Sequence, residues 1–277
     1  MTADSATFTF SPHEKMREGY IRVLRKISSM AKARGKNSRV PVDEAIHDVR
    51  VFIKRLRALL WFARPALPES VEKQVRELLT TAARSLAGQR DLAVTRATLE
   101  ILAGTKKLGK RVAVARVARR LSLAADETAE KNLRNQTQKA AGILRQAIAK
   151  IIAHTGEDPK WPVASQRIKK AVQATRRAGK KALRTKNDIA FHAWRKKTKC
   201  LLYLTELTGS HDHVITQKRL NKLQKHLGDD HDCVMAAQRL RAAPVPASDR
   251  RHVSKLLLQR KARLRKKARK IARRMDL

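Results

Sequence analysis

The residues best suited to bind a ligand are His47, Arg50, Lys54 and Arg57, which lie in the stretch 42–64. A helix has about 3.6 residues per turn, so these four side chains project from one side of it. The opposite side is apolar and consists of Val49, Phe52, Ile53, Leu56, Leu59, Leu60 and Ala63. A row of cations above an apolar face is typical of a solvated helix, and it also suits a surface that holds an anion.

The same spacing of His, Arg and Lys occurs again 145 positions along the chain. The matched pairs are His47/His192, Arg50/Arg195 and Lys54/Lys199. We call His47, Arg50, Lys54 and Arg57 the first stripe, and His192, Arg195, Lys196 and Lys199 the second stripe. A solvated face has no reason to repeat this spacing, so the repeat favours anion contact by both histidines.

A second block of sequence repeats in the same order, at an offset of 141. It aligns RSLAGQRDLAV with KHLGDDHDCVM, and its matched pairs are Arg84/Lys225, Leu86/Leu227, Arg90/His231 and Asp91/Asp232. Two blocks at nearly equal offsets indicate two similar helical halves, about 11–121 and about 126–274, within one domain 11–274. Residues 1–10 read as a flexible N-terminal tail. Packing of the halves about a pseudo-two-fold axis would bring both stripes to one basic channel.

Composition limits the classes of partner. The 277 residues include 64 Lys and Arg but only 24 Asp and Glu, a formal net charge of +40. So many positive side chains repel one another unless an anion lies close by. We therefore expect the partner to be nucleic acid, an anionic membrane surface or another polyanion. With 42% hydrophobic residues the chain can build a core, and few Gly and Pro favour an all-α fold.

Targeting signals and cysteine motifs are missing from the sequence. The start MTADSATFTF is no secretory signal, and no apolar run is long enough for a membrane span, so we expect a cytoplasmic protein without membrane insertion. Cys200 and Cys233 have no CxxC spacing and are expected to be reduced.

Gly and Pro residues are predicted to mark the ends of the helices. Ser11-Pro12 is predicted to open the first helix, and Pro41 and Pro65 to bound the helix of the first stripe. The sequence also predicts breaks at Gly88 and at Gly228, with Asp91 and Asp232 capping the helices after these breaks or holding a neighbouring cation. Trp61, Trp194 and Phe52 are predicted to be core residues.

The segments HDVRVFIKRLR, HAWRKKTKCLLYLTE and LGDDHD closely resemble the CHAD family, the conserved-histidine α-helical domain. The resemblance covers about 11–274. It implies a duplicated all-α fold of two four-helix bundles, with a basic cavity or surface that binds inorganic polyphosphate, and association with polyphosphate granules. The residues that match the family's motifs are both stripes together with Arg90 and His231. Arg84 and Lys225, one turn earlier, are secondary candidates.

The chain departs from the family pattern at three points. Leu202 precedes Tyr203 where the family usually has Arg, and Cys200 occupies a position where Lys or Arg is common. The second stripe is therefore expected to be the thinner one. The Glu-x-Glu-x-Lys motif of the triphosphate-tunnel domain that is fused to many family members does not occur.

The resulting prediction is non-enzymatic binding of polyphosphate, with no cofactor. Protonation of His47 and His192 would make binding tighter at pH 6 than at pH 8. A metal site from His211, His213, His226, His231 and Asp232 is not predicted, because their spacing fits no known pattern. A nucleic-acid-compacting protein remains the main alternative, although aromatic residues are only 4%. A polyphosphate-processing enzyme is the third candidate function, and no nucleophile motif or phosphate-binding loop supports it.

Overall fold

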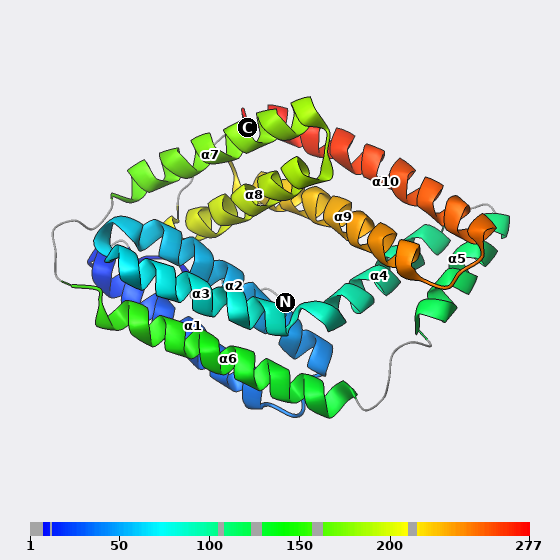
Figure 1. Ribbon diagram of the computed structural model, residues 1–277. Helices are drawn as coiled ribbons and strands as arrows, with labels where there is room; N and C mark the ends of the chain where they lie inside the picture. The colour runs from blue at the N-terminus through cyan, green and yellow to red at the C-terminus, as the bar shows by residue number, and fades with distance from the viewer. Residues whose placement is uncertain (1–7, 12, 105–107, 123–128, 157–162, 210–214) are drawn as a thin grey trace. The chain divides into compact units, whose positions relative to one another are not determined.

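The computed structural model describes residues 8–11, 13–104, 108–122, 129–156, 163–209 and 215–277 (Figure 1). These residues form α-helices and no strand, as the all-α prediction requires. The helices are α1 (Met16–Lys36), α2 (Val42–Ala63), α3 (Glu69–Ser85), α4 (Ala87–Ala103), α5 (Leu108–Ser122), α6 (Ala129–Ala153), α7 (Ala164–Thr185), α8 (Asp188–Thr208), α9 (Gln217–Ala242) and α10 (Ala247–Arg273). None of the described helices is apolar over the length that crossing a bilayer requires.

The chain forms two compact units, each taken from three stretches of sequence. Unit 1 consists of Met1–Ala87, Glu130–Thr175 and Lys199–Gln217, and unit 2 of Gly88–Ala129, Arg176–Thr198 and Lys218–Leu277. The boundary between the units therefore falls within α7 and α8. The predicted division of the domain into two repeats, about 11–121 and about 126–274, stays a prediction.

Unit 1 is built around the apolar faces of α1, α2, α3 and α6. Val49, Phe52, Ile53, Leu56, Leu59, Leu60 and Ala63, the face predicted for α2, are all at most 5% exposed. Tyr20 of α1 is fully buried and its hydroxyl donates to Leu59 O at 3.2 Å. Residues 8–10 also pack here: Phe8 is 3% exposed, and Phe10 N donates to Leu207 O at 2.7 Å.

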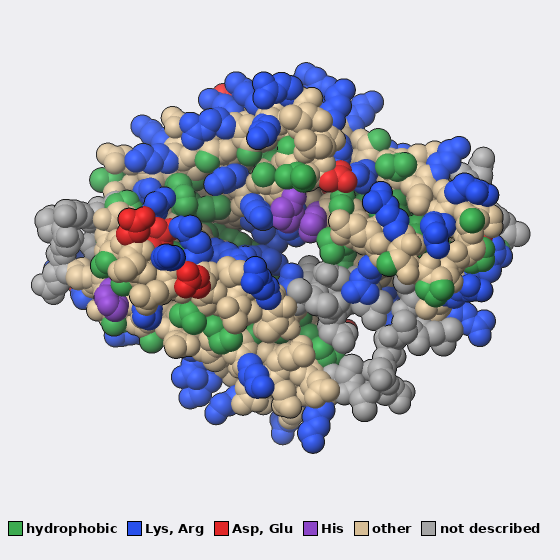
Figure 2. Space-filling view, in the orientation of Figure 1, with side chains coloured by type: hydrophobic (Ala, Val, Ile, Leu, Met, Phe, Trp, Pro, Cys, Tyr) green, Lys and Arg blue, Asp and Glu red, His purple; other side chains and the backbone are tan. Residues whose placement is uncertain are grey.

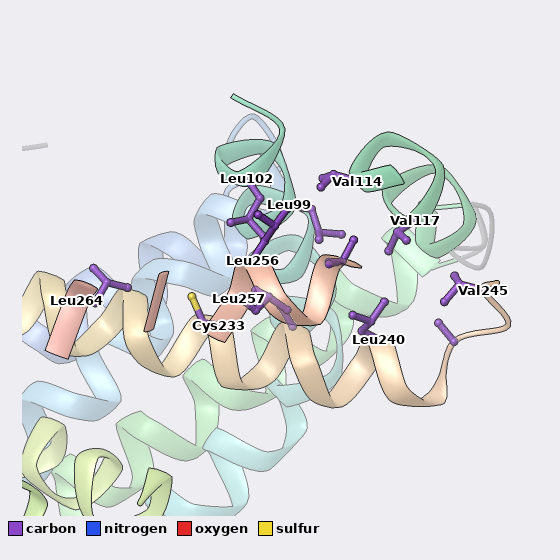
Figure 3. Packing of buried hydrophobic residues seen from close by; sticks show 13 residues of the cluster. Leu99, Leu102, Val114, Val117, Cys233, Leu240, Val245, Leu256, Leu257 and Leu264 are labelled. Carbon is purple, nitrogen blue, oxygen red and sulfur yellow. The ribbon is translucent and has the colours of Figure 1, made fainter. Parts of the chain in front are cut away.

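Unit 2 contains a separate core in which α4, α5, α9 and α10 meet (Figure 3). Leu99 and Leu102 enter it from α4, and Val114 and Val117 from α5. The α9 and α10 side chains in this core are Cys233, Ala236, Leu240, Val253, Leu256, Leu257 and Leu264. Arg116 of α5 pairs with Asp249 of α10 at 2.6 Å at the edge of this core.

Proline marked the helix ends better than glycine did. α2 begins after Pro41 and ends before Pro65, as predicted. The predicted break at Gly228 is wrong, because α9 is continuous from Gln217 to Ala242. A glycine inside a helix costs only about 1 kcal/mol, which the buried leucines at 220, 223 and 227 outweigh. Asp232 therefore lies in mid-helix and caps nothing.

The first helix also begins later than predicted. α1 starts at Met16, not at Ser11. The chain turns at Ser11, whose N–H donates to Glu14 Oε1 at 2.6 Å, and Glu14 in turn pairs with Arg22. This turn is what brings Phe8 and Phe10 onto unit 1. The break after α3 falls at Leu86, two residues before Gly88.

Candidate anion-binding surfaces

The first stripe lies on the side of α2 that faces away from the core of unit 1. His47 and Arg57 are exposed, and Arg50 and Lys54 are half-buried. Because the opposite side of α2 is buried throughout, the orientation of the helix is fixed and the four side chains share one surface. The predicted alignment of the first stripe is therefore present within this unit.

Two arginines of the first stripe are held by carbonyl oxygens of α3 and of the residue that ends it. Arg50 Nη1 donates to Leu86 O at 2.8 Å, and Arg57 Nη2 donates to Leu79 O at 3.1 Å. Contact with α3 partly desolvates the Arg57 guanidinium and lowers its pKa from the ordinary value. A guanidinium has five N–H donors, so one such bond fixes its position and leaves donors for phosphoryl oxygens.

Two of the three acidic residues of α2 are turned toward α1. Arg34 of α1 pairs with Asp48 at 2.7 Å and with Glu44 at 3.7 Å. These contacts draw both carboxylates off the side of α2 that carries the stripe. The third acidic residue, Asp43, is exposed one turn before His47, at the N-terminal end of the first stripe.

The second stripe lies on α8 at helical spacing. Arg195 and Lys196 belong to unit 2, and Lys199 is the first residue of the last stretch of unit 1. Lys196 is exposed, whereas His192, Arg195 and Lys199 are half-buried. Trp194, on the other side of α8, is fully buried, which fixes the rotation of the helix. As predicted, Trp194 and Phe52 are core residues, while Trp61 is only half-buried under the Arg167 guanidinium.

Two histidines that are distant in the sequence meet in unit 2. The ring centroids of His192 on α8 and His231 on α9 are 4.5 Å apart. Burial, with the nearby charges of Lys196 and Arg195, lowers the pKa of His192. Burial, followed by Arg195, His192 and Lys196, lowers the pKa of His231 to about 4. Both shifts favour the neutral imidazole, so they act against the gain in charge that the sequence predicts for His192 on acidification.

A neutral imidazole can still take part in phosphate binding through hydrogen bonds. The Nδ1 atom of His192 is buried and has no hydrogen-bond partner among the described residues. A buried polar atom normally has one, so this nitrogen is suited to a ligand or a water. Because the lowered pKa values favour the neutral rings, the cationic attraction at this place is supplied mainly by Arg195 and Lys196.

An ion-pair network holds the helices beneath the histidine pair. Arg265 of α10 donates from Nε to Asp230 Oδ1 at 2.8 Å and from Nη2 to Asp188 Oδ1 at 2.5 Å. Lys261 Nζ lies 2.7 Å from the same Asp188 oxygen, and the Arg265 guanidinium stacks on the Phe191 ring at 4.0 Å. Burial raises the pKa of Asp230 even though Arg265 opposes the shift. Sequence reasoning missed this network, because Arg265 looks like any other cation of a basic helix.

The remaining predicted residues are only partly placed. Arg84 is exposed in the last turn of α3, two residues before the carbonyl that Arg50 contacts. Lys225 is exposed on α9, nearly two turns before His231. Arg90 and Asp91 lie within α4, but their side chains are outside the described residues, as are His211 and His213. Among the described residues, no group of three or more His, Cys, Asp or Glu could hold a metal ion.

On the face of the molecule shown in Figure 2, Lys and Arg cover far more of the surface than Asp and Glu, which form small isolated patches. The carboxylates at 72, 188, 206, 230 and 249 are each in ion pairs with arginine. Few carboxylates are therefore left to compensate the cations of the surface, which favours contact with an extended anion.

A protein-family comparison matches the CHAD domain over residues 25–241. The chain belongs to the CHAD-domain family. The match includes both stripes, so the resemblance drawn from HDVRVFIKRLR and LGDDHD is confirmed. A search of curated proteins found no match.

Two solved structures have the same fold. The CHAD domain from the plant Ricinus communis aligns with a TM-score of 0.65 at 18% identity, covering 98% of this chain and 94% of that one. PptA from Streptomyces chartreusis aligns with a TM-score of 0.62 at 17% identity, covering 95% of this chain and 98% of that one. At these identities the likeness establishes the fold and not the ligand.

Proposed function

We propose that this protein binds inorganic polyphosphate, without catalysis, through the first and second stripes. Membership of the CHAD-domain family supports the ligand, and the arrangement of the first stripe supports the mode of binding. Its two arginines are fixed at α3, while Glu44 and Asp48 of the same helix pair with Arg34 of α1. A chain of phosphoryl groups has no bases to read, so it requires spaced cations and not a recognition code.

The proposed contacts have distinct roles. Arg50, Arg57 and Arg195 offer planar forks to pairs of phosphoryl oxygens, whereas Lys54, Lys196 and Lys199 act as mobile point charges. His47, His192 and His231 add hydrogen bonds, and Arg84, Arg90 and Lys225 extend the positive surface. Convergence of both stripes on a central basic cavity, and association with polyphosphate granules, are part of the proposal.

The observation that carries this proposal is the pair of orienting bonds from Arg50 and Arg57 to carbonyl oxygens at α3. The test is equilibrium binding of long-chain polyphosphate over a range of salt from about 50 to about 500 mM. We expect the logarithm of the affinity to fall linearly with the logarithm of salt, at about 0.7 per phosphate contact as for single-stranded nucleic acid. An affinity that is insensitive to salt would contradict the proposal.

The absence of catalysis is tested with the same ligand. Polyphosphate incubated with the protein and Mg²⁺ or Mn²⁺ is expected to keep its length distribution on a gel. Shortening that depends on the protein and disappears in the Lys54→Gln, Lys199→Gln double variant would show a polyphosphate-processing enzyme instead.

A further inference from the structure

A groove outside both stripes runs between α1 and α6 in unit 1. The two helices are antiparallel, since Arg17 near the start of α1 donates to Thr155 O beyond the end of α6 at 3.1 Å. At the other end of α1, a Cβ added at Gly35 would lie 3.1 Å from Ala141 Cβ. The middle of α1 therefore faces the last three turns of α6.

The residues that line this groove repeat with the same spacing on both helices. α1 supplies Arg25, Ser28, Ser29 and Lys32, and α6 supplies Arg145, Ile148, Ala149 and Ile152. Positions 0, +3, +4 and +7 form one continuous helix face, about 10 Å long for a rise of about 1.5 Å per residue. The volume of the groove is about 420 Å³, and Ile148, which is 2% exposed, belongs to its floor.

The charges of the groove have no internal compensation. No Asp or Glu occurs among the described residues that line it. Arg25, Lys32 and Arg145 are exposed, and none of them forms an ion pair with a described carboxylate. Three cations and two serine hydroxyls around one hollow are suited to an anion, because hydroxyls also donate to phosphoryl oxygens.

A second hollow, lined by residues of α1, α2 and α6, contains arginines that bind partners within the fold. It measures about 350 Å³ and is lined by Arg34 and Arg134, among others. Arg34 is paired with Asp48 and Glu44, and Arg134 donates to Val40 O at 3.2 Å. Those guanidinium groups join elements of the fold, whereas Arg25, Lys32 and Arg145 form no such contact with the residues that the structure describes.

We propose that the α1–α6 groove is a further anion site, one that takes several consecutive phosphoryl groups of a polyphosphate. The identity of the ligand rests on the proposed function, while the site rests on the groove alone. A polyphosphate bound at a stripe would then have a second contact surface on unit 1. The binding mode is side-on, with phosphoryl oxygens facing the three cations and the serine hydroxyls.

The test is calorimetric titration with tripolyphosphate, a probe short enough for one groove. The groove variant is Arg25→Gln, Lys32→Gln, Arg145→Gln. The matched control is Lys26→Gln, Lys131→Gln, Lys139→Gln, which removes the same charge from exposed positions of the same helices outside the groove. Both sets are placed in the wild type and in a stripe variant, Lys54→Gln, Lys196→Gln, Lys199→Gln.

In the stripe variant, tripolyphosphate is expected to remain bound at one site per chain. The groove substitutions should then weaken that binding more than tenfold, and the control substitutions less than threefold. Equal effects of the two sets of substitutions would contradict the proposal that the groove is an anion site. Loss of all binding in the stripe variant would contradict the groove site and leave the proposed function intact. Binding that depends on the groove alone would count against polyphosphate binding by the stripes.

Thermal unfolding checks each variant before titration, and Arg145→Gln alone replaces the triple substitution if that protein is unstable. The single change is expected to weaken binding at least threefold in the stripe variant. No weakening there, with Lys139→Gln as its control, would again overturn the groove.

Discussion

The two stripes share a sequence spacing but have different surroundings. On α2 the histidine is exposed, and the arginines at 50 and 57 are anchored at α3 by carbonyl oxygens. On α8 the histidine is half-buried and contacts His231, over a network centred on Arg265. The first stripe is a row of cations that is partly covered by α3, and the second combines cations with two imidazoles whose pKa values are lowered. Equal spacing thus fixes which side chains share a face, while the neighbouring helices decide their charge and exposure.

The largest expected effect is that of removing the cations of the first stripe. The variant Arg50→Gln, Lys54→Gln, Arg57→Gln should lose about 100-fold or more in polyphosphate affinity near 0.1 M salt, because hydrogen bonds to charged groups contribute about 1.5–3 kcal/mol each. The salt slope should fall by about 2, at about 0.7 per contact. Fluorescence titration of labelled polyphosphate at several salt concentrations measures both.

The same variant should also be less stable. Loss of the two bonds to carbonyl oxygens at α3 is expected to cost about 1 kcal/mol each in the free energy of unfolding. The variant Lys26→Gln, Lys131→Gln, Lys139→Gln has the same net charge and serves as the control for both quantities. If that control loses as much affinity as the stripe variant, binding depends on net charge and not on the stripe.

A smaller loss is expected from the second stripe. The variant Arg195→Gln, Lys196→Gln, Lys199→Gln should bind polyphosphate about tenfold more weakly, because this stripe has Cys200 and Leu202 where the family has cations. The titration is the same as for the first stripe. A loss as large as that of the first stripe would remove the distinction between them.

The neutral histidine pair predicts how stability depends on pH. Burial lowers the pKa of both rings when the protein is folded, so between pH 6.5 and pH 4 the unfolded chain binds more protons. The contribution of this histidine pair to stability should therefore be complete above about pH 6.5, fall as the pH drops and be lost by about pH 4. Urea unfolding at pH 7, 5.5 and 4 should show a decline that is smaller by about 1 kcal/mol in His231→Asn, after allowance for the partial exposure of the ring. An unchanged decline would show that His231 is charged in the folded state.

The smallest expected effect is that of pH on binding. In a His47→Asn background, polyphosphate affinity should change less than twofold between pH 8 and pH 6.5, because the lowered pKa values of His192 and His231 favour the neutral rings. Titration of labelled polyphosphate at four pH values checks this. A tenfold tightening over the range would restore the charge role that the sequence suggests.

The sequence predicted the parts of the fold that depend on local patterns. The apolar face of α2 was correct at every position, and the prolines at 41 and 65 marked its ends, because both signals act within one helix. The break predicted at Gly228 was wrong because the free-energy cost of a helical glycine is small compared with the stabilisation from burying the leucines that precede it. The start of α1 was wrong because Phe8 and Phe10 pack on distant residues, which no local cap signal reveals.

The candidate sites could likewise be predicted only where they depend on the pattern of a single helix. Helical spacing placed the cations of both stripes correctly, but it could not show that His192 meets His231 from another helix. The pKa of each ring is lowered first by burial, and the contact with His192 adds to the shift of His231. The groove between α1 and α6 was missed for the same reason, since each helix carries only half of it.

The most direct test of the central claim is competition between polyphosphate and DNA. Labelled duplex DNA is bound to the protein in about 0.15 M salt, and long-chain polyphosphate is added up to equal phosphate concentration. The account predicts displacement of most of the DNA, and weaker displacement from the Arg50→Gln, Lys54→Gln, Arg57→Gln variant. DNA that remains bound at equal phosphate would contradict polyphosphate binding as the function and would favour a nucleic-acid-compacting protein.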